Sequence, residues 1–217
     1  MGARDIGTAT SQKRRLLLID NHPILRDGLA YFIRSEPDLE ICGQVGNSVK
    51  ALYDIAALKP DLVILDIILK DCNGLDLIKR IRTLYRELPI LAFSVNEELL
   101  YAERALRAGA LGYVMKQSAG DEVVLAIRRV LRGERYLSAR VQEHMAEKLS
   151  GTASSVNSIA ALALEHLSDR EMEVFQLIGE GYSTRQVASK RGKKVSDVIG
   201  RRADGASAAQ PAADAEG

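Results

Sequence analysis

Short apolar runs alternate with amphipathic segments along residues 16–132, and this alternation restricts the possible folds more than any other feature of the sequence. Leu16–Ile19 and Leu62–Leu65 are continuously apolar, as is expected of strands that are buried on both faces of a sheet. The predicted strands are Leu16–Ile19, Glu40–Val45, Leu62–Leu65, Pro89–Phe93 and Leu111–Met115. Because a helical segment follows each strand, the sequence predicts an α/β fold, a parallel sheet with helices on both faces.

Helical spacing of apolar residues identifies the segments that follow these strands. Pro23 suits the first turn of a helix, and Asn73-Gly74 is a turn signal in front of another. Gly109 is placed to end the helix that begins near Glu97. The predicted helices are Pro23–Ile33, Ser48–Leu58, Leu75–Leu84, Glu97–Ala108 and Asp121–Leu131, with a further helix through Val141, Met145 and Leu149.

Composition excludes several classes of protein. The 217 residues suffice for one large domain or two small ones, and the apolar fraction of 47% can support a packed core. Cys42 and Cys72 have the spacing of neither a metal site nor a disulfide framework, so we expect two reduced thiols. No run approaches the about 18 apolar residues of a membrane span, and Leu16–Ile19 is too short for a signal-peptide core. We therefore expect a soluble, cytoplasmic protein without a membrane partner.

Polar residues stand directly after four of the predicted strands, namely Asp20-Asn21, Asp66, Ser94 and Lys116. Parallel sheets bind ligands beyond the carboxyl ends of their strands, so the fold would gather these residues at one edge. Taken singly, each has an ordinary explanation, because a strand-end aspartate is more often a helix cap and a lysine is usually a solvated charge. Their occurrence in order, each after its own strand, favours a shared site.

This combination suits the transfer of a phosphoryl group to a carboxylate. Asp66 would be the nucleophile, and a divalent cation is needed to hold a phosphoryl group among crowded carboxylates. Mg²⁺ fits this role because it is a hard ion that prefers oxygen ligands. Lys116 would offer a point charge to the transferred oxygens, and the hydroxyl of Ser94 could hydrogen-bond the new phosphate.

Four segments resemble the receiver domains of two-component response regulators, in particular those of the NarL/FixJ family, also called LuxR-type. They are LLLIDNHPILRDGL (Leu16–Leu29), PDLVILDIILKDCNGLDLIKRIR (Pro60–Arg82), ILAFS (Ile90–Ser94) and AERALRAGALGYVMKQ (Ala102–Gln117). The resemblance covers about residues 14–135 and implies a five-stranded, doubly wound, flavodoxin-like receiver domain. It also implies that a sensor histidine kinase phosphorylates Asp66 in a Mg²⁺-dependent reaction.

The same resemblance implies roles for further residues. Asp20, Asn21, Asp66 and the backbone carbonyl of Ile68 would hold the metal ion, with Lys116 as the family's lysine and Ser94 as its switch hydroxyl. Tyr113 would be the aromatic side chain that swings when Ser94 engages the phosphate, although a half-buried tyrosine on a strand explains the sequence equally well. A receiver transfers the phosphoryl group to itself, so it is not an enzyme in the usual sense.

Two positions depart from the family's pattern. The family usually has two acidic residues after the first strand, whereas this chain has Asp20-Asn21, so we expect weaker binding of Mg²⁺ and slower phosphorylation. Leu69-Lys70 replaces the Met-Pro of many members, which reshapes the loop after Asp66 but removes no chemical group.

Two capping boxes open helices in the C-terminal part of the chain. Ser168 to Glu171 fits S-x-x-E and Ser183 to Gln186 fits S-x-x-Q, with Gly179 and Gly181 between them as helix stops. The segment LSDREMEVFQLIGEGYSTRQVASK (Leu167–Lys190) resembles the first two helices of the LuxR-type DNA-binding domain, a helix-turn-helix unit. This resemblance implies binding to DNA and pairing into a homodimer.

The resemblance ends at Lys190. Arg191 and Lys193 stand where the family packs apolar residues, and beyond a possible short helix near Val195–Arg202 no large apolar residue follows. The segment Arg185–Arg202 nonetheless contains seven Lys and Arg against one Asp, a net charge of +6 that suits phosphates. The DNA-binding candidates are Arg185, Lys190, Lys193, Lys194, Arg201 and Arg202, although a solvated basic tail explains these charges almost as well. The abrupt change in composition suggests a truncated or frame-shifted reading of the gene.

We therefore expect a flexible N-terminus (1–13), a receiver domain (14–135), a linker (136–166), an incomplete helix-turn-helix domain (167–202) and a disordered tail (203–217). The leading hypothesis is a response regulator that controls transcription by binding DNA. The alternative is a phosphorylated interaction module or phosphate sink without competent DNA binding. A phosphatase with an aspartyl nucleophile is disfavoured, because Ile68 stands where its general acid would be.

Overall fold

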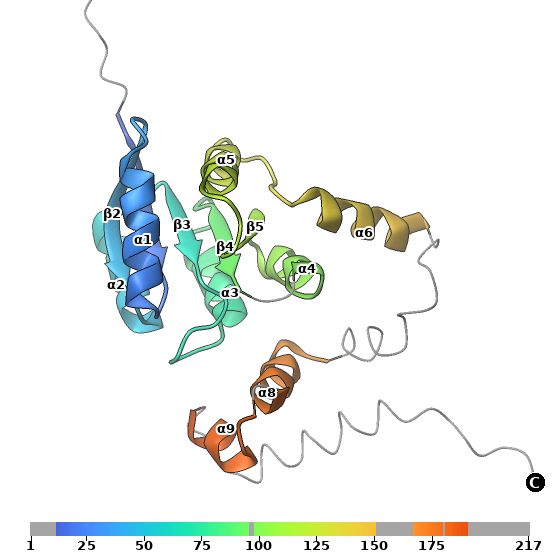
Figure 1. Ribbon diagram of the computed structural model, residues 1–217. Coiled ribbons are helices and arrows are strands. Elements are labelled where there is room, and N and C mark those ends of the chain that lie inside the picture. Colours follow the sequence, from blue (N-terminus) through green and yellow to red (C-terminus); the bar gives the residue numbers. More distant parts are fainter. Residues whose placement is uncertain (1–11, 96–97, 151–166, 180, 191–217) are drawn as a thin grey trace, which may run out of the picture.

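The computed structural model describes residues 12–95, 98–150, 167–179 and 181–190 (Figure 1). The strands are β1 (Arg14–Ile19), β2 (Leu39–Val45), β3 (Leu62–Leu65), β4 (Ile90–Ser94) and β5 (Gly112–Met115). The helices are α1 (Pro23–Arg34), α2 (Ser48–Leu58), α3 (Gly74–Leu84), α4 (Glu98–Ala108), α5 (Gly120–Leu131), α6 (Ala139–Ser150), α8 (Asp169–Gly179) and α9 (Thr184–Lys190). We call residues 14–131 the α/β domain, and α8 with α9 the C-terminal helix pair.

The five strands form one sheet in the order β2-β1-β3-β4-β5, and every neighbouring pair is parallel. This confirms the predicted doubly wound, flavodoxin-like sheet. In such a sheet the strand order reverses between β1 and β3, and the crevice beyond their carboxyl ends is the usual place for a ligand. Ile19 pairs with Leu65 at those ends, so the residues that follow them, Asp20 and Asp66, are brought side by side.

Alternate residues of each strand enter two separate apolar layers, because side chains of a strand point to opposite faces. Leu16 and Leu18 pack in the layer that contains α1 and α5. Leu17 and Ile19 pack in the layer that contains α2, α3 and α4. Burial on both faces explains why residues Leu16–Ile19 of β1 are all apolar, which confirms that prediction.

The chain that follows α5 stays in contact with the α/β domain. Tyr136 is 6% exposed, its N–H donates to the carbonyl of Leu111 at 3.1 Å, and its carbonyl accepts from the N–H of Tyr113 at 3.1 Å. Helix α6 confirms the helix predicted through Val141 and Met145, and it packs against α4 with Val141 2% exposed. Residues 136–150, expected to be part of a linker, therefore lie on the surface of the sheet domain.

Both predicted capping boxes are confirmed. The N–H of Ser168 donates to Glu171 at 2.8 Å, and the N–H of Glu171 returns a bond to the Ser168 hydroxyl at 3.3 Å. Ser183 and Gln186 make the same reciprocal pair at 2.8 and 3.4 Å. The helix pair has a small core of its own, formed by Val174, Val187 and Ala188.

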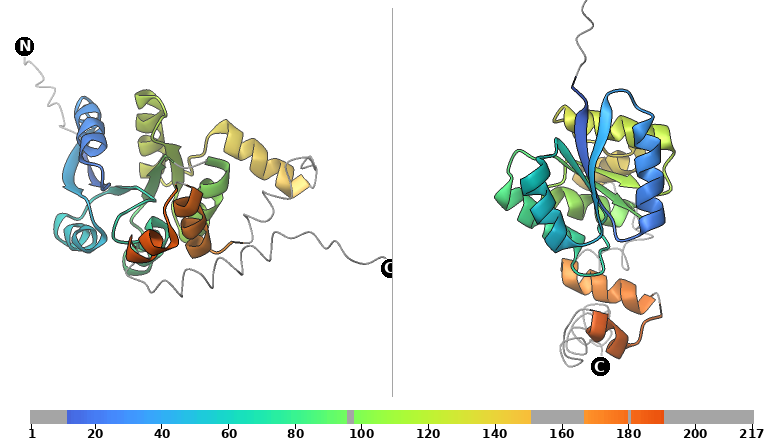
Figure 2. Two further views of the ribbon diagram at one scale, coloured as in Figure 1. Left: turned by 60° about the horizontal axis from the view of Figure 1, so that its bottom comes forward. Right: turned by 90° about the vertical axis from the view of Figure 1, so that its left-hand side faces the viewer.

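The apolar face of α8 is partly covered by the α/β domain and partly exposed. Phe175 is 53% exposed, whereas Met172 is 1% exposed and belongs to the apolar layer of α3 and α4. The helix pair therefore lies at the end of the α/β domain below α3 and α4 (Figures 1 and 2). The short helix expected near residues 195–202, the tail 203–217 and most of the N-terminus 1–13 fall outside the described residues.

Among the helices that the structure describes, none is long and apolar enough to cross a membrane. 

Gly74 begins α3 where there is no room for a side chain. A Cβ atom there would lie 2.5 Å from the carbonyl oxygen of Ile67 and 2.6 Å from that of Asp66, both of which are backbone atoms. We expect Gly74→Ala to lower the free energy of unfolding by about 2 kcal/mol or more, as overpacked sites do. Urea denaturation measures this, with Gly28→Ala as control.

Gly28 lies in α1 with nothing within 4 Å of the position of its missing Cβ atom. Gly28→Ala should therefore raise the free energy of unfolding by roughly 0.5–1 kcal/mol, because alanine has the higher helix propensity. Equal effects of the two substitutions would contradict the crowding at Gly74.

Candidate functional site

Asp66 follows directly after β3, a strand that is buried along its whole length. All four residues of β3 are buried, and Asp66 itself is only 2% exposed. Its N–H donates to the carbonyl of Ile19 at 2.8 Å, which continues the pairing of β3 with β1. One carboxylate oxygen, Oδ1, accepts the N–H of Ile68 at 3.0 Å. The second oxygen, Oδ2, is directed to the charged groups of the neighbouring loops.

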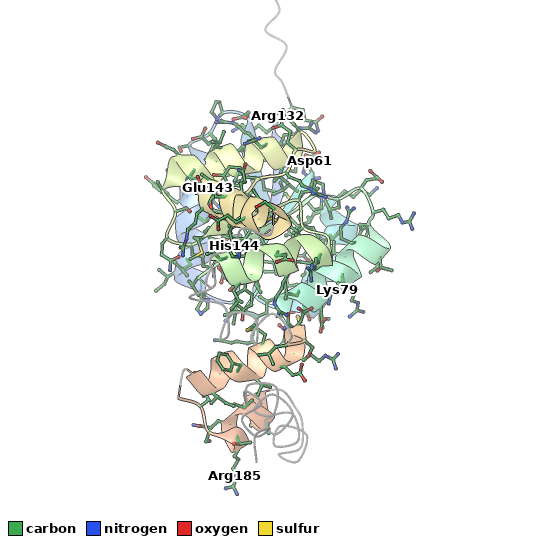
Figure 3. The ribbon with its side chains drawn as sticks, turned by 90° about the vertical axis from the view of Figure 1, so that its right-hand side faces the viewer. Asp61, Lys79, Arg132, Glu143, His144 and Arg185 are labelled. Atoms are coloured by element: carbon green, nitrogen blue, oxygen red, sulfur yellow. The ribbon has the colours of Figure 1, made fainter. Side chains whose placement is uncertain are left out.

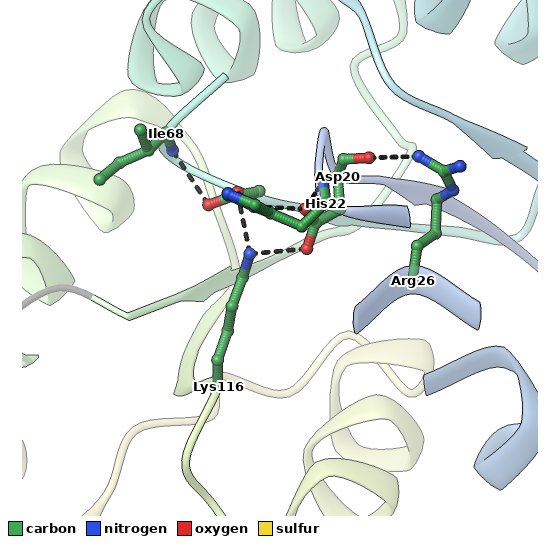
Figure 4. Close-up of polar contacts among 6 residues, drawn as sticks. Asp20, His22, Arg26, Ile68 and Lys116 are labelled. Atoms are coloured by element: carbon green, nitrogen blue, oxygen red, sulfur yellow. Dashed lines mark hydrogen bonds and ion pairs between the residues drawn. The ribbon is translucent and has the colours of Figure 1, made fainter. Parts of the chain in front are cut away.

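Lys116 joins the two buried carboxylates of the site. Its Nζ lies 2.6 Å from Oδ2 of Asp20 and 2.9 Å from Oδ2 of Asp66, and its side chain is 3% exposed (Figure 4). The backbone N–H of Lys116 donates to the carbonyl of Ser94 at 2.8 Å. This bond to the end of β4 holds the backbone from which the Lys116 side chain extends into the site. The structure therefore brings Asp20, Asp66 and Lys116 together, as the order of the strands led us to expect.

The site has more buried negative than positive charge. Burial raises the pKa of Asp66, and the neighbouring Asp20 acts in the same direction, while Lys116 opposes both without reversing the shift. One ammonium cannot neutralise two desolvated carboxylates. The arrangement consequently favours a further cation.

His22 is a site residue that the sequence reasoning missed. Its N–H donates to Oδ1 of Asp20 at 2.8 Å, and its ring Nδ1 lies 3.2 Å from the same oxygen and 3.8 Å from Oδ2 of Asp66. Its side chain is 52% exposed, so it lies at the mouth of the site rather than inside it. The only signal in the sequence was its position two residues after Asp20 in one short loop.

The donor groups of the site fit a hard divalent cation. Ligand atoms of Asp20, His22 and Asp66 all lie within 4.8 Å of one another. The amide oxygen Oδ1 of Asn21 is buried and has no hydrogen-bond partner in the part of the chain that the structure describes. Two carboxylates and a free amide oxygen form an oxygen-rich set, which Mg²⁺ prefers. Ile68 is held next to this set because its backbone N–H donates to Oδ1 of Asp66.

The two switch candidates lie on neighbouring strands. Ser94 ends β4 and is completely buried. Tyr113 pairs with Ala92 across β4 and β5, and it is completely buried rather than half-buried. Because Tyr113 already lies in the core, a movement of its side chain would change the packing of that core.

Only one DNA-binding candidate has a described side chain. Arg185 is exposed on α9 and points away from the α/β domain (Figure 3). Lys190 ends α9. Lys193, Lys194, Arg201 and Arg202 lie outside the described residues.

Asp169, the first residue of α8, connects the C-terminal helix pair to the α/β domain. Its Oδ2 lies 2.6 Å from Nζ of Lys79 on α3, and its Oδ1 lies 3.1 Å from Nη1 of Arg104 on α4. Asn73, which caps α3, donates to the carbonyl of Asp169 at 3.4 Å. Burial alone would raise the pKa of Asp169, but Lys79 and Arg104 outweigh it and hold that pKa below its usual value. We call Asp169, Lys79 and Arg104 the interdomain clamp.

The family model and two curated relatives that this chain matches all belong to response regulators or transcriptional regulatory proteins. Residues 16–128 match the family model of the response regulator receiver domain. Over 181 residues the chain is 30% identical to the transcriptional regulatory protein LiaR of Bacillus subtilis, a match that covers 81% of each chain. It is 27% identical over 175 residues to the response regulator protein VraR of Staphylococcus aureus, covering 81% of this chain and 80% of that one.

Solved structures show the same fold. A LuxR-family two-component response regulator from Aurantimonas is 30% identical, with a TM-score of 0.60 over 64% of this chain and 99% of that chain. RcsB of Salmonella typhimurium is 20% identical, with a TM-score of 0.70 over 94% of each chain, a likeness that concerns the fold alone.

Proposed function

The chain belongs to the response regulator receiver domain family, and from this premise we propose that a sensor histidine kinase phosphorylates it on Asp66 to control binding to DNA. The observation that carries the proposal is the buried carboxylate of Asp66, which Lys116 contacts at 2.9 Å beside the second carboxylate, Asp20. Relatives that the chain matches over four fifths of its length are named as transcriptional and response regulators.

In the proposed reaction, a carboxylate oxygen of Asp66 attacks the phosphorus of a phosphohistidine. The phosphorus–nitrogen bond breaks, an acyl phosphate forms on Asp66, and the imidazole nitrogen leaves with the electron pair and is then protonated. Lys116 supplies a positive charge to the phosphoryl oxygens without moving far, since it already contacts Asp66. Bound Mg²⁺, held by Asp20, Asn21, Asp66 and the Ile68 carbonyl, would neutralise part of the charge on those oxygens.

The proposed switch begins at Ser94. Its hydroxyl would hydrogen-bond the new phosphate, and the buried side chain of Tyr113 would shift in response, which would alter the surface of α4 and β5. Helices α6 and α8 pack on or near α4, so the output helices lie where such a change would reach them. We assign residues 14–135 to the receiver and 167–202 to a helix-turn-helix domain, and we place the protein in the cytoplasm with its kinase and DNA partners.

Incubation with acetyl phosphate and Mg²⁺ tests the proposal directly. Intact-mass measurement should show the addition of one phosphoryl group to wild type, and its absence when Mg²⁺ is chelated. Asp66→Asn serves as the control. A mass increase that survives Asp66→Asn would place the phosphoryl group elsewhere and refute the assignment.

DNA binding is tested separately, because the proposed contacts involve Arg185 and basic residues beyond α9. Affinity for promoter-length DNA should fall steeply as salt rises, since phosphate contacts release counterions. A phosphorylated protein that shows no salt-dependent affinity for DNA would instead be the interaction module or phosphate sink.

Substitution of Asp169 by alanine is expected to loosen the interdomain clamp. The change removes charged bonds to the largely buried Arg104, worth about 1.5–3 kcal/mol, and to the half-exposed Lys79, worth about 0–1 kcal/mol. Hydrogen exchange in α8 should therefore become faster by about tenfold or more, while the sheet keeps its protection. Because the pKa of Asp169 is lowered, the clamp is intact above pH about 4 and is lost as pH falls through the lowered value.

Asp76→Ala is the matched control for this substitution. Asp76 lies in the same interface but is 42% exposed, and its contacts with Lys79 and Arg170 are long, at 3.7 and 3.8 Å, so its loss should change exchange in α8 only slightly. If both variants accelerated hydrogen exchange in α8 equally, the contacts of Asp169 with Lys79 and Arg104 would not be what holds α8 on the α/β domain.

A further inference from the structure

We propose that Arg26 is a positioning residue for the phosphorylation site, which holds Asp20 in the place where it can bind a divalent cation. The inference rests on the proposed function, because it concerns how the metal-binding side of that site is built. Arg26 lies on α1 and is not among the residues to which the receiver resemblance assigns a role. Its side chain contacts the backbone carbonyl of Asp20 rather than the carboxylate of that residue.

Arg26 closes the loop between β1 and α1 at both ends. Its guanidinium Nη1 donates to the carbonyl of Asp20 at 2.6 Å (Figure 4). Its own N–H makes the first helical bond of α1, to the carbonyl of His22 at 3.0 Å. The loop that carries Asp20, Asn21 and His22 is therefore tied to the first turn of α1 by one residue. A loop fixed at two points loses little further freedom when it binds an ion.

The carboxylate and the backbone of Asp20 have different partners, and His22 Nδ1 also lies 3.2 Å from Oδ1. The N–H of Asp20 donates to the carbonyl of Val45 at 3.0 Å, Oδ1 accepts the N–H of His22, and Oδ2 accepts Lys116. Arg26 takes only the carbonyl, so the guanidinium does not compete for the carboxylate oxygens.

Gly46, the first residue after β2, makes room for the guanidinium. A Cβ atom at Gly46 would lie 3.3 Å from Nη1 of Arg26, 3.7 Å from the carbonyl oxygen of Asp20 and 3.9 Å from Cα of Asn21. The Nε of Arg26 is buried and has no hydrogen-bond partner among the described residues. Burial of a charged guanidinium with an unpaired Nε costs free energy. A positioning role for the Nη1 bond to Asp20 accounts for this cost.

Calorimetric titration of Mg²⁺ alone into the full-length chain tests the proposal. The variants are Arg26→Met, which removes the donors and the charge, Arg26→Lys, which keeps a charged donor, and Gly46→Ala, which crowds the guanidinium. Arg34→Met is the matched control, because Arg34 is an exposed arginine in the last turn of the same helix. The rate of phosphorylation by acetyl phosphate is measured as well, at saturating Mg²⁺.

Arg26→Met should raise the dissociation constant for Mg²⁺ by about tenfold or more, the usual effect of losing a group that orients a metal ligand. Arg26→Lys should recover part of this loss, and Gly46→Ala should weaken binding in the same direction. At saturating Mg²⁺ the rate should remain close to that of wild type, because Asp66 and Lys116 are untouched. A merely structural role would lower the melting temperature without this split between affinity and rate.

Unchanged Mg²⁺ affinity in Arg26→Met, with wild type that binds Mg²⁺ and is phosphorylated, would overturn the inference and leave the proposed function standing. If wild type neither binds Mg²⁺ nor takes up a phosphoryl group, the proposed function fails and the inference fails with it. If Arg26→Met does not fold, Arg26→Lys and Gly46→Ala decide the matter, and wild-type affinity in both would overturn the proposal.

Discussion

Replacement of Asp66 by asparagine is expected to abolish the uptake of a phosphoryl group while it leaves the protein at least as stable as wild type at neutral pH. The amide lacks the nucleophilic oxygen, and no other described carboxylate is contacted by both Lys116 and the Ile68 N–H. Loss of uptake would then not result from unfolding. The expected phosphoryl incorporation in the variant is zero within the detection limit of intact-mass measurement.

The stability part of this prediction follows from the direction of the pKa shift. Because burial raises the pKa of Asp66, the folded state binds the proton more tightly than the unfolded state does. The protonated carboxyl therefore contributes its full stabilisation below pH about 3.9, the pKa in the unfolded chain. This contribution is lost as pH rises through the raised pKa of Asp66 in the folded state. Asparagine mimics the neutral carboxyl, so the variant avoids that loss.

Melting temperatures of wild type and Asp66→Asn, measured against pH in the presence of a chelator, check the sign. The variant should melt at or above the temperature of wild type at pH 7, and the difference should shrink near pH 4. A variant that is less stable than wild type at every pH would contradict the view that the carboxylate is held at a cost.

Replacement of Lys116 by alanine should have the largest effect on stability. The substitution leaves Oδ2 of Asp20 and Oδ2 of Asp66 buried without the cation that now contacts both. Breaking a buried ion pair from one side costs about 3–5 kcal/mol. We therefore expect a loss of this size in the free energy of unfolding when Mg²⁺ is chelated, and a fall in phosphorylation rate of about a hundredfold.

Urea denaturation with and without Mg²⁺ measures the first effect. Mg²⁺ should restore much of the lost stability, because it would supply positive charge to the same two carboxylates. Arg107→Ala, which breaks an exposed pair with Glu103 on α4, should cost only about 0.3–0.5 kcal/mol. Similar losses in both variants would contradict the burial of charge at Lys116.

Much of the α/β domain was predictable because burial on both faces of the sheet requires continuous apolar strands. β3 was predicted with both of its bounds, and β1 differs only by the addition of Arg14 and Arg15. The gathering of Asp20, Asp66 and Lys116 followed from the position of each residue after its own strand. The capping boxes were predictable because all of their bonds are local in sequence.

Contacts between distant segments were not predictable in the same way. The Arg26 bond to a backbone carbonyl depends on the path of one loop, and neither its donor nor its acceptor belongs to a spacing rule. The interdomain clamp joins Asp169 to Lys79 and Arg104, which lie 90 and 65 residues away. Each of these residues looks like an ordinary surface charge in the sequence, because the partner that fixes it is supplied only by the tertiary structure.

The pairing of Tyr136 with β5 has a consequence for association between molecules. β5 is an outermost strand, and the unpaired amides and carbonyls of such an edge can template the addition of a strand from another chain. Here the N–H of Tyr113 and the carbonyl of Leu111 are already occupied by Tyr136 of the same chain. An incoming strand would have to peel this segment away first, so the protein protects its own sheet against aggregation along that side.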